Sequence, residues 1–204
     1  LNDLSSRANR SLMARTSGTT SLVSIGPAGE QLLTGASVAC TDQDNRHPAR
    51  HAARGGVGAV MGSKRLKFVA IERGKSRLRE AKNKSDFNEL AKKYTKAYLD
   101  GPQMFKTGTS SIVPIANMLQ TFPYKNRVFG QSPDAANLDG ARIVESFEKR
   151  GGSMHNCLTG CIVRCSNIVH DADGKYKTSA LEFETLTLLG ANCAVASWED
   201  VADL

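Results

Sequence analysis

Residues 151–165 read Gly-Gly-Ser-Met-His-Asn-Cys-Leu-Thr-Gly-Cys-Ile-Val-Arg-Cys, and this stretch holds three of the five cysteines of the chain. Cys157, Cys161 and Cys165 fall within nine residues, with Gly160 relaxing the backbone between them. Closely spaced thiolates are the ligands that soft metal centres require. The spacing therefore predicts three ligands of an iron–sulfur cluster, just after two glycines that end a helical pattern.

Two other interpretations of these cysteines stay open. Structural zinc usually takes close cysteine pairs in two separated knuckles, and this chain has three-residue gaps and no second knuckle. His155 and His170 could complete a zinc site, although neither has convincing spacing. The cysteines could also be reduced core residues. A [4Fe–4S] cluster requires a fourth thiolate, which would be Cys193, Cys40 or a residue elsewhere in the protein.

The residues that follow the cysteines supply candidate carboxylates. Residues 181–192 predict a fairly apolar helix, with Glu182 and Glu184 in its first turn. Carboxylates at a helix start commonly interact with the helix dipole or with solvent. The functional alternative is a general acid or base beside a metal-bound substrate.

Two amphipathic patterns precede the cysteines. The first begins at Ser85, a typical N-cap residue, and ends at the Asp-Gly-Pro sequence of residues 100–102. Lysines 92, 93 and 96 are the expected solvated face of this first pattern. The second pattern spans residues 137–149. The apolar positions at helical spacing are Phe87, Leu90, Ala91, Tyr94 and Tyr98 in the first pattern and Leu138, Ala141, Val144 and Phe147 in the second.

A glycine-rich segment lies in the N-terminal part, which otherwise predicts strands at residues 22–25, 37–40 and 66–71. It reads Arg54-Gly-Gly-Val-Gly-Ala-Val-Met-Gly-Ser-Lys64. Its glycines let backbone amides approach an anion, and the flanking cations favour a phosphate. The order Gly-Ser-Lys excludes a P-loop, and the glycine spacing excludes a dinucleotide fingerprint. We therefore expect either an anion-binding loop that leads into a strand or a simple glycine-rich turn.

Composition limits the class of protein. The 204 residues are 40% hydrophobic and carry a net charge of +7, which suits a globular protein with acidic or phosphate-bearing partners. No apolar run approaches the roughly 20 residues that span a bilayer. The odd number of clustered cysteines indicates a reducing, cytoplasmic setting. We expect an α+β fold, with strands in residues 1–75, a charged linker at 76–84 and a mainly helical part at 85–204. Residues 26–29 predict a turn, residues 42–53 a polar loop and residues 171–174 a hairpin turn.

Two segments together resemble one known family. Ile25-Gly-Pro-Ala-Gly-Glu30, followed by residues 54–67, resembles the N-terminal domain of the aldehyde ferredoxin oxidoreductases. The three cysteines, followed by Ala180-Leu-Glu-Phe-Glu-Thr-Leu-Thr-Leu-Leu-Gly-Ala-Asn-Cys193, are similar to the start of that family's second domain. Gly108-Thr109 and residues 123–127 are weaker landmarks. The resemblance runs from about Thr16 onward, in the family's order.

The resemblance implies a set of cofactors that the spacing of the residues does not indicate by itself. Members hold tungsten or molybdenum between two pterins linked by Mg²⁺, and a [4Fe–4S] cluster passes electrons to ferredoxin or another iron–sulfur carrier. They oxidise aldehydes to carboxylic acids. Residues 1–75 would be the end of the pterin-binding domain. The residues expected to contact the pterin and its phosphate are Arg54, Gly55, Gly56, Val57, Gly58, Met61, Gly62 and Lys64.

The resemblance also assigns the second half of the site. Cys157, Cys161 and Cys165 would be cluster ligands, although the first gap is one residue longer than is common in the family. Glu182 would be the active-site glutamate, with Glu184 as the alternative. We expect a segment of a longer protein whose fourth cluster ligand and active-site histidine lie elsewhere, so the chain alone would be inactive.

Partners and alternatives complete the expectation. The protein could form a homo-oligomer or a redox complex, with no nucleic-acid or membrane partner. One alternative is the metal-bearing subunit of a related complex that reduces aromatic thioesters. Another, of a different class, is a basic zinc- or cluster-containing nucleic-acid-binding module, whose affinity would fall with salt.

Overall fold

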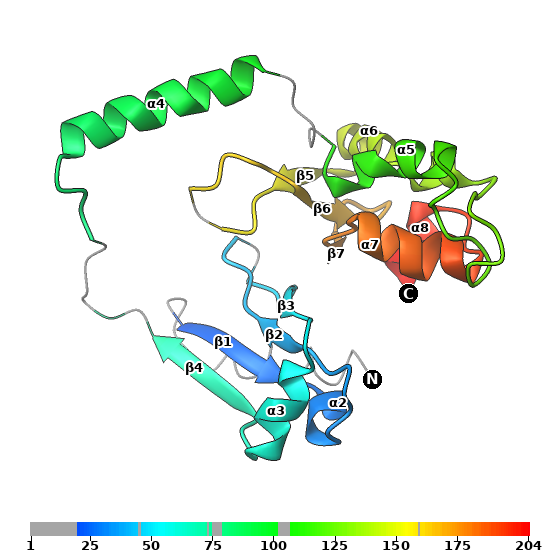
Figure 1. The fold of residues 1–204 in the computed structure, drawn as a ribbon, viewed down its shortest axis with the longest axis horizontal. Helices are drawn as coiled ribbons and strands as arrows, with labels where there is room; N and C mark the ends of the chain where they lie inside the picture. The colour runs from blue at the N-terminus through cyan, green and yellow to red at the C-terminus, as the bar shows by residue number, and fades with distance from the viewer. Residues whose placement is uncertain (1–19, 45, 73, 75–78, 102–106, 159) are drawn as a thin grey trace. The chain divides into compact units, whose positions relative to one another are not determined.

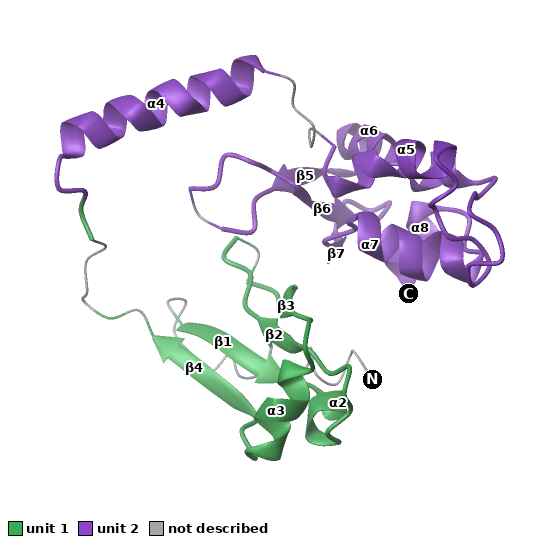
Figure 2. Cartoon of the chain, in the orientation of Figure 1, with its two compact units in different colours: residues 1–80 green, residues 81–204 purple. Residues whose placement is uncertain are grey.

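The computed structural model of the chain describes residues 20–44, 46–72, 74, 79–101, 107–158 and 160–204. The chain divides into two compact units, Leu1–Glu80 and Ala81–Leu204 (Figure 2). The first unit is built on an antiparallel sheet, and the second combines helices with a smaller sheet (Figure 1). The predicted α+β class is confirmed.

Four strands form the sheet in the described part of unit 1, in the order β3-β2-β1-β4. β1 (Thr20–Ile25), β2 (Val38–Cys40) and β4 (Phe68–Glu72) lie where strands were predicted. β3 (Arg50–Ala52) lies inside a stretch, 42–53, that the sequence predicted to be a loop. That prediction was wrong because pairing with β2 forms this short strand, which has no apolar pattern of its own.

Two short helices replace an expected turn and an expected loop in unit 1. α2 (Pro27–Glu30) forms where residues 26–29 predicted a turn, and its proline stands at the first helical turn, where proline is tolerated. α3 (Val57–Ser63) forms where the glycine-rich segment predicted a loop leading directly into a strand. The two helices contact each other, and Gly62 of α3 lies in that contact, because a Cβ there would lie 2.0 Å from Gly29 O of α2.

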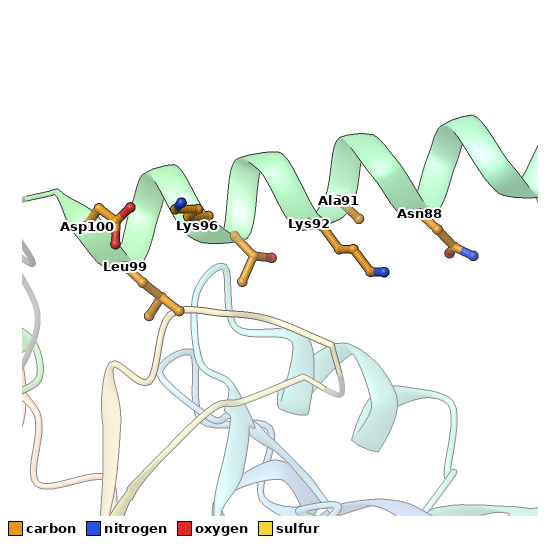
Figure 3. Close-up of a pocket in the computed structure, with 7 residues that line it drawn as sticks. Asn88, Ala91, Lys92, Lys96, Leu99 and Asp100 are labelled. Carbon is orange, nitrogen blue, oxygen red and sulfur yellow. The ribbon is translucent and has the colours of Figure 1, made fainter.

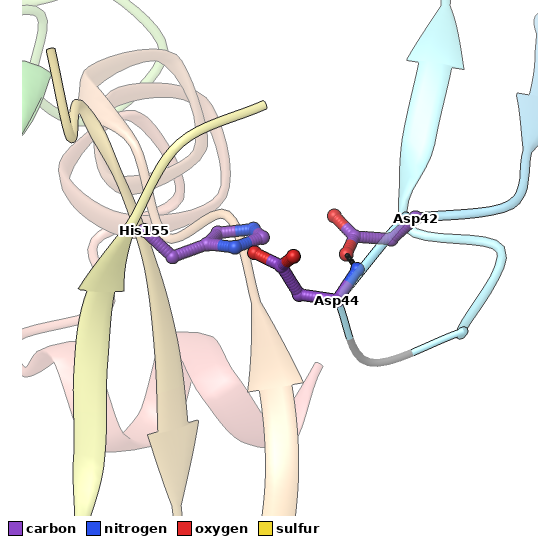
Figure 4. Close-up of side chains that lie close together, drawn as sticks. All are labelled: Asp42, Asp44 and His155. Atoms are coloured by element: carbon purple, nitrogen blue, oxygen red, sulfur yellow. Dashed lines mark hydrogen bonds between the residues drawn. The ribbon is translucent and has the colours of Figure 1, made fainter. Parts of the chain in front are cut away.

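A buried carboxylate organises the connection between β2 and β3. Asp42 is 1% exposed and accepts a hydrogen bond from Arg50 Nε at 2.7 Å. Its Oδ1 also accepts from the backbone N–H of Asp44 at 2.9 Å, within the turn drawn in Figure 4. A buried carboxylate requires such partners, so this ion pair fixes the polar loop.

Three antiparallel strands form the sheet in the described part of unit 2, in the order β5-β6-β7. They are β5 (Gly152–His155), β6 (Ser166–His170) and β7 (Tyr176–Ser179). β6 and β7 are joined by the predicted hairpin turn at Asp171–Gly174. Asp171 Oδ1 accepts from the N–H groups of Asp173 and Lys175, each at 2.9 Å, which confirms that turn.

Helical elements complete unit 2, and most of them bury residues in its core, whereas α4 buries none. They are α4 (Lys84–Asp100), η1 (Thr109–Ile112), α5 (Val113–Met118), η2 (Ala135–Leu138), α6 (Gly140–Arg150), α7 (Phe183–Thr185), the π-helical η3 (Leu186–Gly190), η4 (Ala191–Cys193) and α8 (Trp198–Asp203). The helix predicted over 137–149 is divided at Asp139, whose carboxylate accepts from Ala141 N–H at 3.3 Å. Ile143, 1% exposed, is buried within α6, whereas Ala141 and Val144 are half-buried.

The ends of the helices follow local signals. Gly151 ends α6 with φ +76°, as the paired glycines predicted. Ser197 caps α8 by accepting from Asp200 N–H at 3.2 Å, which agrees with its capping-box spacing. The helix predicted over 181–192 is instead three consecutive segments, because a π-helical turn interrupts the α-helical hydrogen bonding.

α4 is exposed on its apolar face as well as on its polar face. Phe87, Leu90 and Tyr94, which are apolar positions of the predicted amphipathic pattern, are 60%, 52% and 73% exposed. Its N-cap is Asn83, which accepts from Asp86 N–H at 3.2 Å, so the prediction of Ser85 as the cap was wrong by two residues. Asn88, Lys92 and Lys96 project from the helix in Figure 3, and the lysine face is exposed as predicted. None of the described helices is long and apolar enough to cross a membrane.

Candidate functional site

The cysteine segment is the long connection of a β-hairpin in unit 2. β5 ends at His155 and β6 begins at Ser166, and these two residues are cross-strand partners. The ten intervening residues are therefore held at both ends by one sheet. Within the loop, Asn156 Nδ2 donates to Cys161 O at 2.9 Å, and Cys161 N–H donates to Leu158 O at 3.1 Å. The backbone around Cys161 is thus folded back on the loop.

The three thiols differ in exposure. Cys157 is exposed, while Cys161 and Cys165 are half-buried. Gly160, between the first two, has φ +86°, and a Cβ there would meet no atom within 4 Å. The glycine is therefore required by its left-handed backbone conformation rather than by crowding.

Glu182 lies within electrostatic reach of the cysteines. Burial, and then the negative charges of Glu182 and Cys157, raise the pKa of the Cys165 thiol, with a smaller contribution from Cys161. A metal cation would reverse this effect by stabilising the thiolate. Glu182, Cys157 and Cys161, three residues that the sequence singled out, therefore lie within electrostatic range of Cys165.

The two candidate glutamates occupy different environments. Glu182 is the N-cap residue of α7 and is half-buried, whereas Glu184 lies in the first turn and is exposed. The Glu182 side chain makes no capping hydrogen bond to its own helix. Partial burial and proximity to Cys165 favour Glu182 as the carboxylate that belongs to the site.

Cys193 and the histidines are placed less favourably for a metal centre. The Cys193 thiol is exposed and donates to Leu188 O at 3.2 Å, and Cys40 lies in unit 1. His170 ends β6, about 13 Å along the strand from its first residue. His155 is 4% exposed and ends β5 (Figure 4), so it is the histidine adjacent to the cysteine loop.

Asn167 is a buried residue of the site that the sequence did not single out. It is 1% exposed, its Nδ2 donates to Leu181 O at 2.9 Å, and its Oδ1 accepts from Leu181 N–H at 3.0 Å. Its own carbonyl accepts from Ala180 N–H at 2.9 Å. This asparagine, two residues after Cys165, therefore holds the residues that lead into Glu182. Only its position beside the cysteines could have indicated this role.

Replacing Asn167 by leucine is expected to destabilise unit 2 by about 2–3 kcal/mol, because both buried backbone groups of Leu181 lose their partner. Denaturant unfolding followed by the fluorescence of Trp198, the single tryptophan, measures this change. Asn88→Leu on exposed α4 is the matched control and should leave the midpoint within error. A neutral Asn167→Leu would contradict the role of the buried amide.

The glycine-rich segment of unit 1 has two parts with different surroundings. Gly58 N–H donates to Ala36 O at 2.9 Å, and a Cβ on Gly58 would lie 2.5 Å from Ser37 O. A Cβ on Gly56 would lie 2.4 Å from Thr34 O. In contrast, Gly55 has φ +76° and open space around its Cβ position. Close backbone packing thus accounts for the later glycines, and only the first leaves room for a ligand.

The other predicted residues of this segment lie around α3. Arg54 and Lys64 are exposed on either side of the helix, and Met61 is half-buried within it. His51 lies on β3, where its Nδ1 is 3.1 Å from Ser37 Oγ, and burial lowers its pKa. His47 lies in the β2–β3 connection, with its carbonyl accepting from Asp42 N–H at 2.8 Å. Unit 1 therefore offers cations at both ends of α3.

Comparisons with known proteins cover both units. The family model for the aldehyde ferredoxin oxidoreductase N-terminal domain matches residues 3–73, and the model for domains 2 and 3 of the same family matches residues 88–204. The tungsten-containing aldehyde ferredoxin oxidoreductases of Pyrococcus furiosus and Pyrococcus horikoshii are each 33% identical to the chain, over 176 and 178 residues. Each alignment covers 85% of this chain and 27% of the relative.

A solved structure shares the fold. The active-site complex BamBC of benzoyl coenzyme A reductase, in complex with 1,5-dienoyl-CoA, matches with a TM-score of 0.64 and 19% identity. The match covers 96% of this chain and 30% of that chain. The chain thus spans under a third of the length of the proteins to which it is similar.

Proposed function

The chain belongs to the aldehyde ferredoxin oxidoreductase family, and from this premise we propose that the protein oxidises aldehydes to carboxylic acids at a tungsten or molybdenum bis-pterin centre. Electrons would leave through a [4Fe–4S] cluster to ferredoxin. The observation that carries the proposal is the hairpin loop of unit 2, which presents three thiols beside the half-buried Glu182.

The cluster would be held by Cys157, Cys161 and Cys165. Their donor set fits, because iron–sulfur clusters take thiolates and two of these three thiols are half-buried on one sheet-anchored loop. Cys157, the third proposed ligand, is exposed. The fourth ligand would come from another part of the protein.

The pterin phosphates would be held by the segment from Arg54 to Lys64, and Mg²⁺ would link the two pterins. Arg54 and Lys64 supply compensating positive charge, and Gly55 allows the backbone to approach an anion closely. Gly56, Val57, Gly58, Met61 and Gly62 form the supporting α3 region of this proposed cradle.

In the proposed reaction the protein residues bind, orient and move a proton. The bound metal–pterin group supplies the two-electron redox chemistry, and the cluster supplies single-electron transfer. The Glu182 carboxylate would take a proton from the water that attacks the aldehyde carbon. Glu182 is the N-cap residue of α7 and lies within electrostatic range of Cys165, so the proton acceptor and the electron exit would both belong to unit 2.

A second candidate is favoured by the fold. One solved structure with this fold is the active-site complex of benzoyl coenzyme A reductase with 1,5-dienoyl-CoA, so a similar architecture occurs with a coenzyme A thioester. In that case the protein would be the metal-bearing subunit of a larger redox complex. Turnover with aliphatic aldehydes, and none with aromatic thioesters, would favour the first proposal.

Metal analysis of the full-length protein, purified anaerobically, tests the proposal. We expect about four iron atoms per chain together with tungsten or molybdenum, since a [4Fe–4S] cluster and a pterin-bound metal are both required. Zinc without iron would contradict the proposal and restore the zinc interpretation of the cysteines. Binding of DNA or RNA that weakens steeply with salt would instead support the nucleic-acid module.

Replacing Cys165 by serine is expected to remove most of the cluster iron, because a serine hydroxyl is a poor substitute for a thiolate. Iron content and the EPR signal of the reduced protein measure the loss. Cys40→Ser, in unit 1, is the matched control and should retain both. Iron retained in Cys165→Ser would exclude Cys165 as a ligand, whereas equal iron loss from both variants would make Cys40 the fourth ligand.

A further inference from the structure

Thr109 contacts both halves of the proposed site from a distant part of the sequence. Its backbone N–H donates to Cys165 O at 3.3 Å. Its Oγ1 accepts from the N–H of Phe183, the first residue of α7, at 3.0 Å. One residue therefore joins the backbone of a proposed cluster ligand to the helix start that carries Glu182.

The preceding glycine allows this contact. Gly108 has φ +81°, and a Cβ at this position would lie 2.9 Å from Cys165 O. Any side chain would push the loop away from Cys165 and would also strain the backbone. The Gly108-Thr109 pair is thus explained by close approach to the cysteine loop.

The contact with Phe183 replaces a local helix cap. The first N–H groups of a helix have no partner within the helix, and the N-cap side chain usually satisfies one of them. Here the N-cap residue is Glu182, whose side chain makes no such bond, and Thr109 supplies the acceptor from 74 residues away. The orientation of the Glu182 backbone therefore depends on a non-local hydroxyl.

We propose that Thr109 is a positioning residue, which sets the orientation of Glu182 relative to Cys165 and so couples the proposed proton acceptor to the proposed cluster. This inference rests on the proposed function for its catalytic consequence. Asn167 restrains Leu181 from β6, and Thr109 restrains Phe183 from η1. The backbone is therefore restrained immediately before and after Glu182, and loss of the Thr109 hydroxyl removes the restraint on Phe183.

The test compares Thr109→Val, which removes the hydroxyl and keeps the side-chain shape, with Thr109→Ser, which keeps the hydroxyl. In Thr109→Val we expect amide exchange at Phe183 to accelerate by about tenfold, because the Phe183 N–H loses one hydrogen bond. Turnover should fall between about tenfold and a hundredfold through misplacement of the carboxylate, with KM little changed. Thr109→Ser should restore both quantities to within about threefold of wild type.

Two controls separate positioning from general damage. Thr121→Val removes a hydroxyl that bonds Ala116 O at 3.1 Å within a local turn, and it should change neither quantity. Adding Thr109→Val to Glu182→Gln should lower turnover no further, because Thr109 acts through Glu182. Independent, additive losses would overturn the inference.

The outcomes also distinguish this inference from the proposed function. The rate of amide exchange at Phe183 can be measured without bound metal. An unchanged rate in Thr109→Val therefore overturns the positioning role of Thr109, whatever the protein binds. Equal impairment in the valine and serine variants overturns it as well. If Thr109→Val accelerates amide exchange at Phe183 but the wild-type protein holds no iron, the positioning role of Thr109 is retained and the proposed function is refuted.

Discussion

Replacing Glu182 by glutamine is expected to lower aldehyde turnover by about 10² to 10⁴-fold, the range typical for loss of a general base. Glutamine keeps the size and the hydrogen-bonding oxygen of the side chain but cannot accept a proton at neutral pH. Glu182 is the N-cap residue of α7 and makes no capping bond there, so the substitution should leave the helix intact. The measurement is steady-state turnover of the full-length protein, purified anaerobically, with matched metal content.

Glu184→Gln is the natural control for this prediction. It changes a similar carboxylate two residues away that is exposed, so turnover should stay within about threefold of wild type. If Glu184→Gln abolishes turnover while Glu182→Gln does not, the assignment of the two carboxylates is reversed. If both variants keep full turnover, neither residue is the proton acceptor.

Replacing Gly62 by alanine is expected to destabilise unit 1 by about 3 kcal/mol, the upper range for overpacking. A Cβ at this position would lie 2.0 Å from Gly29 O and 2.8 Å from Gly29 C, and both atoms belong to the backbone. In an open helix the same change would stabilise by about 1 kcal/mol through helix propensity. The sign of the effect therefore reports whether α2 and α3 are in close contact.

Gly35→Ala provides the control, because a Cβ on Gly35 meets no atom within 4 Å. Far-UV circular dichroism, at wavelengths that report β-sheet, follows the unfolding of the two variants. Trp198 fluorescence is a separate probe of unit 2. A stabilised Gly62→Ala would mean that the glycine serves ligand approach rather than packing.

Local signals in the sequence determined a substantial part of the structure. The paired glycines that end α6, the serine cap of α8 and the Asp171–Gly174 turn each depend on residues within one or two turns of the chain. The cysteine spacing predicts a cluster, because thiolate chemistry depends on residue type and proximity in sequence, and this assignment stays a prediction. The family resemblance, read from the glycine-rich and cysteine segments together, is confirmed by the family models.

The tertiary structure decided what depends on distant partners. The glycine-rich segment was predicted to be a loop. α3 forms there because Gly58 N–H donates a hydrogen bond to Ala36 O and Gly62 packs on Gly29. Thr109 appeared only as a weak landmark, since its contact with Phe183 spans 74 positions. Sequence patterns report local conformational preference, whereas these contacts exist only after the chain has folded and its buried N–H groups have found acceptors.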